Sequence, residues 1–257
     1  MGVLIGQLTY PYNNAGNITT YSVRVIAGIP DLNFGNGTHN FLYLPVQNPT
    51  TGATWLNNNL GANYSNVNHA SFNLAQQASS STDFNAYGSL IQWGRKTDGH
   101  ELINRTGVSS SSGVNGTTTT LSDNPANNLF IRNSNGTLDW RSSQNSTLWD
   151  GTNAVNNPCP VGYRLPTESE FNAEVLSWSS NNLAGAFASN LKLSTVGYRS
   201  NHDGIVYESG SNGIYWTSTP NFTFSRYLEL RQFGNGAIVA FDSKERSRGA
   251  AVRCIRD

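Results

Sequence analysis

The sequence predicts an α+β fold, in which two short helices pack on antiparallel β-sheets. Short segments alternate between apolar and polar residues, which is typical of half-buried strands. One helix start has the signature of a capping box. Long runs of Ala, Leu, Glu and Lys, which an all-α fold would favour, are few.

The first 47 residues are predicted to form a β-rich N-terminal extension. Residues 21–25 alternate with a period of two, and residues 41–45 form a second apolar run that ends at Pro45. Gly35 and Gly37 mark a turn between these runs. The pattern leaves open whether residues 1–47 are a separate module or a flank of the domain that we expect over residues 48–257.

The clearest helix signal lies after Pro166. Thr167 and Glu170 have the spacing of a capping box, in which each side chain bonds the free backbone N–H of the other. Phe171, Val175 and Trp178 then follow at helical spacing, which predicts a stripe facing the core. A shorter helix is expected over residues 183–189.

The last fifty residues predict strands over 214–217, 226–231, 236–241 and 250–255. Gly234-Asn235-Gly236 stands where a tight hairpin turn is expected. Strand alternation places Leu228 and Leu230 on one face of the second strand, and Tyr227, Glu229 and Arg231 on the other. We expect the second face to be directed outward.

Charge and hydropathy exclude two classes of partner. The 16 basic residues equal the 16 acidic ones, so the chain has no basic footprint for nucleic acid. No apolar run approaches the length that spans a bilayer, so no direct membrane insertion is expected. The first residues lack the basic and apolar regions of a signal peptide.

The two cysteines, Cys159 and Cys254, are disulfide candidates. They are too far apart in sequence for a CxxC metal or redox motif. A bridge between them would close a long loop and remove much of the entropy of the unfolded chain. Two buried free thiols remain the equal alternative.

Catalytic and cofactor motifs are lacking. His100-Glu101 begins like the zinc-protease motif HExxH, but Asn104 stands where the second histidine is required. The sequence holds no GxSxG nucleophile elbow, no phosphate-binding loop and no dinucleotide-binding fingerprint. We therefore expect no catalytic residues, no metal and no cofactor.

Four segments, at residues 51–62, 86–100, 159–170 and 252–257, together carry a family resemblance. They include Trp55, the run 92–95 (QWGR), the run 159–167 (CPVGYRLPT) and the closing run 252–257 (VRCIRD). Their order and spacing resemble the Fibrobacter succinogenes major paralogous domain family, over about residues 48–257.

The resemblance implies a C-type-lectin-like fold of the formylglycine-generating-enzyme branch. That branch includes the variable proteins of diversity-generating retroelements, which occur on phage tails and cell surfaces and bind receptors without catalysis. By this resemblance, residues 220–248 form a variable binding surface. The residues expected to bind ligand are Phe222, Phe224, Arg226, Tyr227, Glu229, Arg231, Phe233, Asn235, Asp242 and Lys244.

The partner implied is a protein or glycan receptor on another cell, and the location implied is a cell surface, the extracellular space or a virion. Aromatic and arginine side chains suit such a surface, because they combine area with polar groups. Alternation leaves open whether Phe222 and Phe224 belong to the core, and it requires Arg226 to lie at a strand edge. The residues expected to be scaffold are Arg164, Trp55, Trp93, Trp216, Cys159 and Cys254.

Three alternatives remain. The chain could be a structural or assembly subunit that forms a homo-oligomer through residues 1–47. It could be an oxidase like the formylglycine-generating enzymes, which use a pair of cysteines. It could be a sugar-binding lectin, although the Glu-Pro-Asn, Gln-Pro-Asp and Trp-Asn-Asp triplets of calcium-dependent lectins do not occur, and Trp140 and Trp149 are expected to be buried.

Overall fold

A computed structural model describes residues 4–26, 28–31, 34, 37, 40–136, 138–233 and 236–257. Most strand pairs are antiparallel, and two α-helices lie in this described part, which gives the expected α+β class. No helix among these residues is long and apolar enough to cross a membrane.

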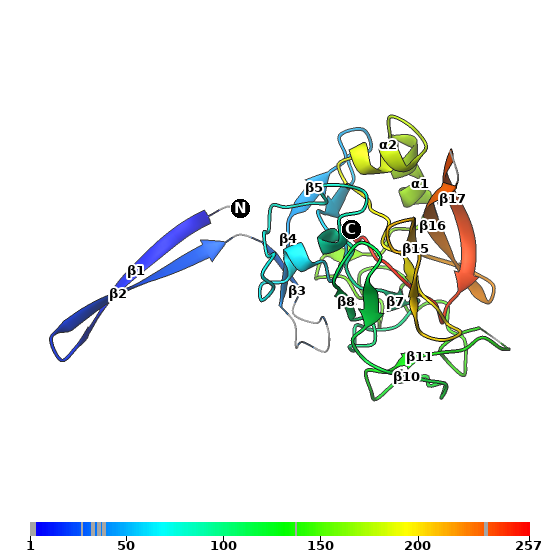
Figure 1. Cartoon of the computed structure of the whole chain (residues 1–257), viewed down its shortest axis with the longest axis horizontal. Coiled ribbons are helices and arrows are strands. Elements are labelled where there is room, and N and C mark those ends of the chain that lie inside the picture. Colours follow the sequence, from blue (N-terminus) through cyan, green and yellow to red (C-terminus); the bar gives the residue numbers. More distant parts are fainter. Residues whose placement is uncertain are drawn as a thin grey trace.

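The N-terminal strands form a hairpin that extends away from the rest of the molecule (Figure 1). Strand β1 (Leu4–Asn14) pairs with β2 (Asn17–Ile26), which contains the predicted strand 21–25. Residues 15–16 form the turn between them. No other strand among the described residues pairs with either of the two.

The second half of the predicted extension belongs to the main body, so the expected boundary at residue 47 does not separate two cores. Strand β3 (Ile29–Asp31) pairs with β4 (Phe41–Tyr43), and β5 (Pro45–Gln47) pairs with β6 (Thr54–Leu56). Phe34, Phe41 and Tyr43 are buried in the main core. Hydrophobic burial therefore draws this flank onto the domain, and the hairpin 4–26 alone projects.

Both predicted helices are present in the described chain. Helix α1 (Glu168–Leu176) begins with the complete Thr167–Glu170 capping box, and Phe171 and Val175 are buried as expected. Trp178 lies just beyond the helix and packs against the same cluster. Helix α2 (Leu183–Ala188) begins at Asn182, whose side chain accepts the backbone N–H of Gly185.

Short strands build two four-stranded sheets that hold the body together. The first has the order β12-β19-β6-β5, with β12 (Tyr163–Arg164) and β19 (Ile255–Arg256). The second has the order β14-β13-β18-β7, with β14 (Val206–Tyr207), β13 (Tyr198–Arg199), β18 (Gly249–Ala250) and β7 (Ile91–Gln92). Two small pairs complete the loops: β8 (Ile103–Arg105) with β9 (Ser111–Gly113), and β10 (Thr117–Thr118) with β11 (Phe130–Ile131).

The longest strands of the body form a three-stranded sheet near the C-terminus (Figure 1). It contains β15 (Asn212–Asn221), β16 (Phe224–Phe233) and β17 (Gly236–Glu245), in that order. These strands contain three of the four predicted C-terminal strands. The expected turn residues Gly234 and Asn235 lie outside the described residues.

The three-stranded sheet lies between two hydrophobic clusters. Trp216 and Tyr227 belong to one cluster, whereas Tyr215, Leu228 and Leu230 belong to the other. Successive residues of a strand point to opposite faces. Both faces of β15 and of the middle of β16 are therefore covered by protein.

The predicted strand over 250–255 is wrong as a continuous element. The chain forms β18 and β19 with residues 252–254 irregular between them. Val252, Arg253 and Cys254 are all buried, which a strand with one exposed face would not allow. Within this irregular segment the guanidinium of Arg253 is buried and donates to Asn59 Oδ1 (3.0 and 2.8 Å) and to the carbonyl of Leu191 (2.7 Å).

Candidate functional site

The residues predicted as scaffold are buried, except for Arg164, which is partly exposed. Trp55, Trp93 and Trp216 are buried, as are Trp140 and Trp149. The indole of Trp93 donates to the carbonyl of Thr217, and that of Trp216 donates to the carbonyl of Ile91 (both 2.9 Å). These reciprocal bonds join the loop after β7 to β15. Arg164 pairs with Glu170, the capping residue of α1, and with Asp257.

Cys159 and Cys254 form a disulfide, so the alternative of two free thiols is excluded in this structure. The bridge spans 95 positions of sequence and ties the end of the chain to the segment before α1. Both residues are buried. Their sulfur atoms are bonded to each other and shielded from solvent, which suits a scaffold position.

Tyr227 was expected to face outward, and the structure corrects this expectation. The side chain is fully buried, and its ring meets Trp216 edge-to-face at a centroid distance of 6.2 Å. Its hydroxyl lies 3.5 Å from one carboxylate oxygen of Glu229 and of Asp242. Burial, and then these two carboxylates, raise the pKa of Tyr227 well above its usual range. Alternation gave the correct side of the strand, but that side is covered by the first hydrophobic cluster.

Arg226 lies on the leucine side, as alternation indicates, but it binds α1 and does not project toward a ligand. Its guanidinium donates to both carboxylate oxygens of Glu168 (2.7 and 2.6 Å) and to Ser243 Oγ (3.1 Å). This fork fixes the sheet against the start of the helix. The structure therefore gives Arg226 a structural partner that the sequence did not predict.

The remaining predicted residues divide into exposed and undescribed positions. Phe222 is 92% exposed at the turn between β15 and β16, and Asp242 is also exposed. Phe224, Glu229, Arg231 and Lys244 are half-buried. Asn235 lies outside the described residues, and only the backbone of Phe233, at the end of β16, is described.

Phe222 combines exposure with an unfavourable backbone. Its φ of 50° lies in the left-handed region, where a residue with a Cβ is strained. The buried guanidinium of Arg246 donates to the Phe222 carbonyl (3.0 Å), and the Gln144 side chain donates to the carbonyl of Thr223 (3.3 Å). The turn is thus held in a conformation that its own residue type disfavours, with the aromatic ring in solvent.

The structure adds residues that the sequence analysis missed. The hairpin β13–β14 brings Tyr198, Tyr207 and Glu208 next to the sheet. The guanidinium of Arg248 lies 4.4 Å from the ring centroid of Tyr198, and Glu208 lies 3.9 Å from Arg231. We call the group Tyr198, Tyr207, Glu208, Glu229, Arg231, Asp242 and Arg248 the sheet-edge patch.

One sequence signal could have found part of this patch. Asp203-Gly204 is a typical hairpin turn pair, and it stands between Tyr198 and Tyr207. It would have predicted the hairpin but not its position. That position is set by long-range contacts, such as the Asn212 side chain, which donates to both Glu208 (2.8 Å) and Glu229 (2.9 Å).

A pocket of about 560 Å³ opens elsewhere among the loops. Segments 95–98, 123–127, 140–148 and 155–156 contribute its lining. We call it the loop pocket. No local sequence pattern predicts this pocket, because its walls come from four separate segments.

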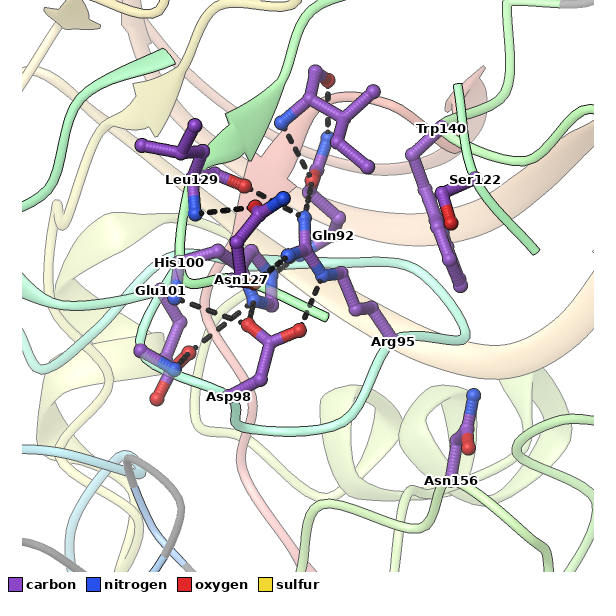
Figure 2. A network of polar contacts seen from close by, with 12 residues as sticks. Gln92, Arg95, Asp98, His100, Glu101, Ser122, Asn127, Leu129, Trp140 and Asn156 are labelled. Atoms are coloured by element: carbon purple, nitrogen blue, oxygen red, sulfur yellow. Dashed lines mark hydrogen bonds and ion pairs between the residues drawn. The ribbon is translucent and has the colours of Figure 1, made fainter. Parts of the chain in front are cut away.

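A buried polar network, shown in Figure 2, adjoins the loop pocket, because two of its members, Arg95 and Asp98, also line the pocket. Arg95 donates to Asp98 Oδ2 (2.8 Å) and to Gln92 Oε1 (2.8 Å). Asp98 Oδ1 lies 2.7 Å from His100 Nδ1, and His100 Nε2 accepts the backbone N–H of Gln92 (3.0 Å). Because Nε2 is an acceptor, Nδ1 carries the proton and donates to Asp98.

Asp98, His100 and Glu101 are close enough to be tested as metal ligands, since one potential ligand atom of each lies within 4.8 Å of the others. The arrangement does not fit a metal well. Both ring nitrogens of His100 already have hydrogen-bond partners, and the Arg95 guanidinium lies against Asp98. A cation would have to displace the His100 proton beside an existing positive charge.

The electrostatics of this network favour neutral groups. Burial, followed by the charge of Arg95, lowers the pKa of His100 to about 4. Burial raises the pKa of Glu101 to about 8. Glu101 Oε2 accepts the N–H of Gly99 (2.9 Å), while Oε1 is buried without a hydrogen bond from any described residue. His100 and Glu101 are thus both predominantly uncharged at neutral pH.

Comparisons with protein-family models, curated proteins and solved structures found no match for this chain. The α+β class therefore rests on the observed strands and helices alone.

Proposed function

We propose that this chain is a non-catalytic recognition domain with a C-type-lectin-like fold, of the kind diversified by retroelements, and that it binds a receptor through the sheet-edge patch and the Phe222 turn. The observation that carries the proposal is the gathering of aromatic and charged side chains from three separate segments, 198–208, 229–231 and 242–248, at one patch. Such mixtures of tyrosine and arginine are enriched in interfaces.

A frame that does not depend on the patch residues supports this proposal. The disulfide, the buried Arg253 and the reciprocal bonds of Trp93 and Trp216 are made without any side chain of the patch. Exposed side chains can then change at little cost to stability, because surface substitutions have small effects. A cell surface or virion is the location that fits such a display protein.

The strained Phe222 turn gives independent support. An exposed aromatic ring adds nothing to the core, and a non-glycine residue with positive φ costs stability. Positions of this kind persist where the surroundings hold them, and they often serve binding. Here Arg246 supplies the support.

The first test is the pattern of differences among sibling sequences from related genomes. The structure divides residues 220–248 into two sets. Differences should concentrate at Phe222, Glu229, Arg231, Asp242 and Lys244, whereas the buried positions 227, 228, 230 and 246 should stay constant. Differences spread evenly over both sets would overturn the diversified surface.

The second test measures binding. The fluorescently labelled full chain is applied to an array of surface glycans and to whole bacterial cells. The double variant Arg231→Glu/Asp242→Lys, which reverses two patch charges, should reduce any specific signal at least tenfold, since losing several interface contacts costs more than about 1.4 kcal/mol. The matched control is Arg256→Glu, an exposed charge on β19. Equal loss in both variants, or no change in either, argues against the patch.

Assembly through the β1–β2 hairpin is a second candidate function, favoured by the projection of that hairpin from the body (Figure 1). A two-stranded hairpin is marginally stable by itself in water, and its edges offer unpaired backbone groups. Pairing with the hairpin of a second copy of the chain would stabilise the hairpin and provide partners for the backbone groups at its edges. Light scattering should show a larger mass for the full chain than for residues 28–257. Cutting at residue 48 would be a poor test, because it also removes Phe41 and Tyr43 from the core.

A further inference from the structure

The loop pocket is large enough for a small ligand and is separate from the surface proposed above. Its volume of about 560 Å³ lies within the range of small-molecule sites. Its lining comes from loops before α1, whereas the sheet-edge patch lies on β13, β14, β16 and β17 and the chain around them. Binding of a ligand in this pocket would therefore be independent of receptor binding by the sheet-edge patch.

Hydrogen bonds brace the walls of the pocket against one another. Arg95 donates to the carbonyl of Asn127 (3.2 Å), and Arg141 donates to the carbonyl of Asp123 (2.6 Å). The Asn156 side chain donates to the carbonyl of Gly94 (2.7 Å), which connects the fourth segment of the lining to the first. These bonds hold the pocket open without a ligand, which lowers the entropic cost of binding.

The polar groups left over in the lining are mainly donors. Asn127 Oδ1 accepts the backbone N–H of Leu129 (3.0 Å), and Asn145 Oδ1 accepts the backbone N–H of Thr147 (2.9 Å). The Nδ2 group of each amide points away from these bonds. Neither Nδ2 group has a hydrogen-bond acceptor among the described residues. The ammonium of Lys96 likewise has no partner within the described chain.

The acidic groups of the lining are already engaged. Asp98 accepts from Arg95 and faces His100. Asp123 accepts from Ser142 Oγ (2.9 Å) and from the backbone N–H of Ser143 (3.0 Å). Three cationic and two acidic residues line the pocket. Since two of the cations lie beside the two carboxylates, Lys96 provides one uncompensated positive charge.

We propose that the loop pocket binds a sugar unit that carries a carboxylate, such as a uronic acid or a sialic acid. Lys96 would pair with the carboxylate, and the amides of Asn127 and Asn145 would donate to ring hydroxyls. Leu148 and the exposed Val155 offer an apolar side for the C–H face of the ring. Open walls of amides favour a ligand with many hydroxyls over an acidic peptide, whose side chains carry few.

The test is calorimetric titration of the full chain with four probes: D-glucuronate, N-acetylneuraminate, D-glucose and an acetylated Glu-Glu dipeptide amide. At least one acidic sugar should bind about fivefold or more tightly than D-glucose, as one exposed ion pair provides. It should also bind more tightly than the dipeptide. Binding of the dipeptide alone, equal binding of D-glucose, or no binding by any probe would each overturn the proposal.

Two substitutions locate the site. Lys96→Gln should weaken the acidic sugar about fivefold and leave D-glucose unchanged. Asn145→Asp keeps the acceptor for Thr147 but replaces the spare donor by a negative charge, so it should weaken the acidic sugar further. The control Lys192→Gln removes a lysine whose ammonium lies against Phe187, away from the pocket, and should change nothing. The Arg231→Glu/Asp242→Lys variant should bind the sugar normally, which separates failure of this site from failure of the patch.

Discussion

The buried frame and the sheet-edge patch use the same residue types in opposite ways. In the frame, Arg253 is buried and its guanidinium meets Asn59 and three backbone carbonyls. In the patch, the Arg231 side chain is 40% exposed and lies 3.9 Å from Glu208. A buried charge must be fully hydrogen-bonded, whereas an exposed one is hydrated and interacts weakly with its neighbours. This fold therefore separates the arginines that stabilise it from the arginines that it displays.

The same contrast explains how a surface could vary on a constant domain. Removing a frame residue leaves buried polar partners without hydrogen bonds, and each such partner costs about 1–3 kcal/mol. Removing Arg231 from the patch leaves its partner Glu208, whose side chain is 35% exposed, hydrated by water. Four measurements test whether frame and patch differ in this way.

The largest effect is expected from the disulfide of the frame. Replacing both cysteines, as Cys159→Ser/Cys254→Ser, should lower the free energy of unfolding by about 4 kcal/mol, because the bridge closes a loop of 95 residues. Urea denaturation followed by tryptophan fluorescence measures the change. A loss below about 1 kcal/mol would show that the bridge contributes little to the frame.

A matched pair of arginine substitutions compares the two regions directly. Arg253→Met should lower the free energy of unfolding by about 3 kcal/mol, because the Asn59 side chain and the Leu191 carbonyl lose their buried donors. Arg231→Met in the patch should change it by less than about 0.5 kcal/mol. Both variants are measured in the same denaturation series, and equal losses would refute the separation of frame and patch.

The buried network that adjoins the loop pocket should make stability depend on pH. The pKa of Glu101 is raised to about 8 in the folded chain, so its contribution is full below the unfolded value of 4.5 and is lost as the pH rises through 8. The pKa of His100 is lowered to about 4, so its contribution is present above 6.5 and is lost as the pH falls through 4.

Between pH 6.5 and 8 the contribution of Glu101 to the free energy of unfolding therefore changes with pH, whereas the contribution of His100 stays constant. Over this window the ionisation of Glu101 should lower the free energy of unfolding of the natural chain by up to about 2 kcal/mol. In Glu101→Gln, which cannot ionise, the fall should be smaller by this amount. Thermal unfolding at half-unit steps of pH measures both profiles, and parallel profiles would exclude Glu101 as the cause.

The smallest effect has the opposite sign. Phe222→Gly should raise the free energy of unfolding by about 1 kcal/mol, because glycine adopts positive φ without strain and the exposed ring contributes no burial. The same substitution should reduce receptor binding in the array experiment. Destabilisation by this variant would mean that the ring packs in the native protein, and it would remove Phe222 from the binding surface.

The elements that the sequence predicted well are those whose causes are local. The Thr167–Glu170 capping box fixed the start of α1, and the spacing of Phe171 and Val175 fixed its buried face. Alternation placed Leu228 and Leu230 on a core face of β16. Each of these depends on residues a few positions apart, whose geometry follows from the helix or strand itself.

The elements that the sequence could not decide depend on contacts between distant segments. Alternation assigns Tyr227 to the opposite face from the leucines, but only the packing of Trp216 and the first cluster buries that face. The loop pocket needs four separate segments, and the sheet-edge patch needs the β13–β14 hairpin beside β16.

Local sequence patterns were sufficient to predict the cap of α1, the faces of the strands and the residue types available for binding. The tertiary structure alone decided which of those residues meet water, because burial depends on what packs against a surface and not on the surface itself. Arg226, Arg231, Arg246 and Arg253 have the same side chain, yet one binds a helix, one is displayed, one holds a turn and one lies in the core.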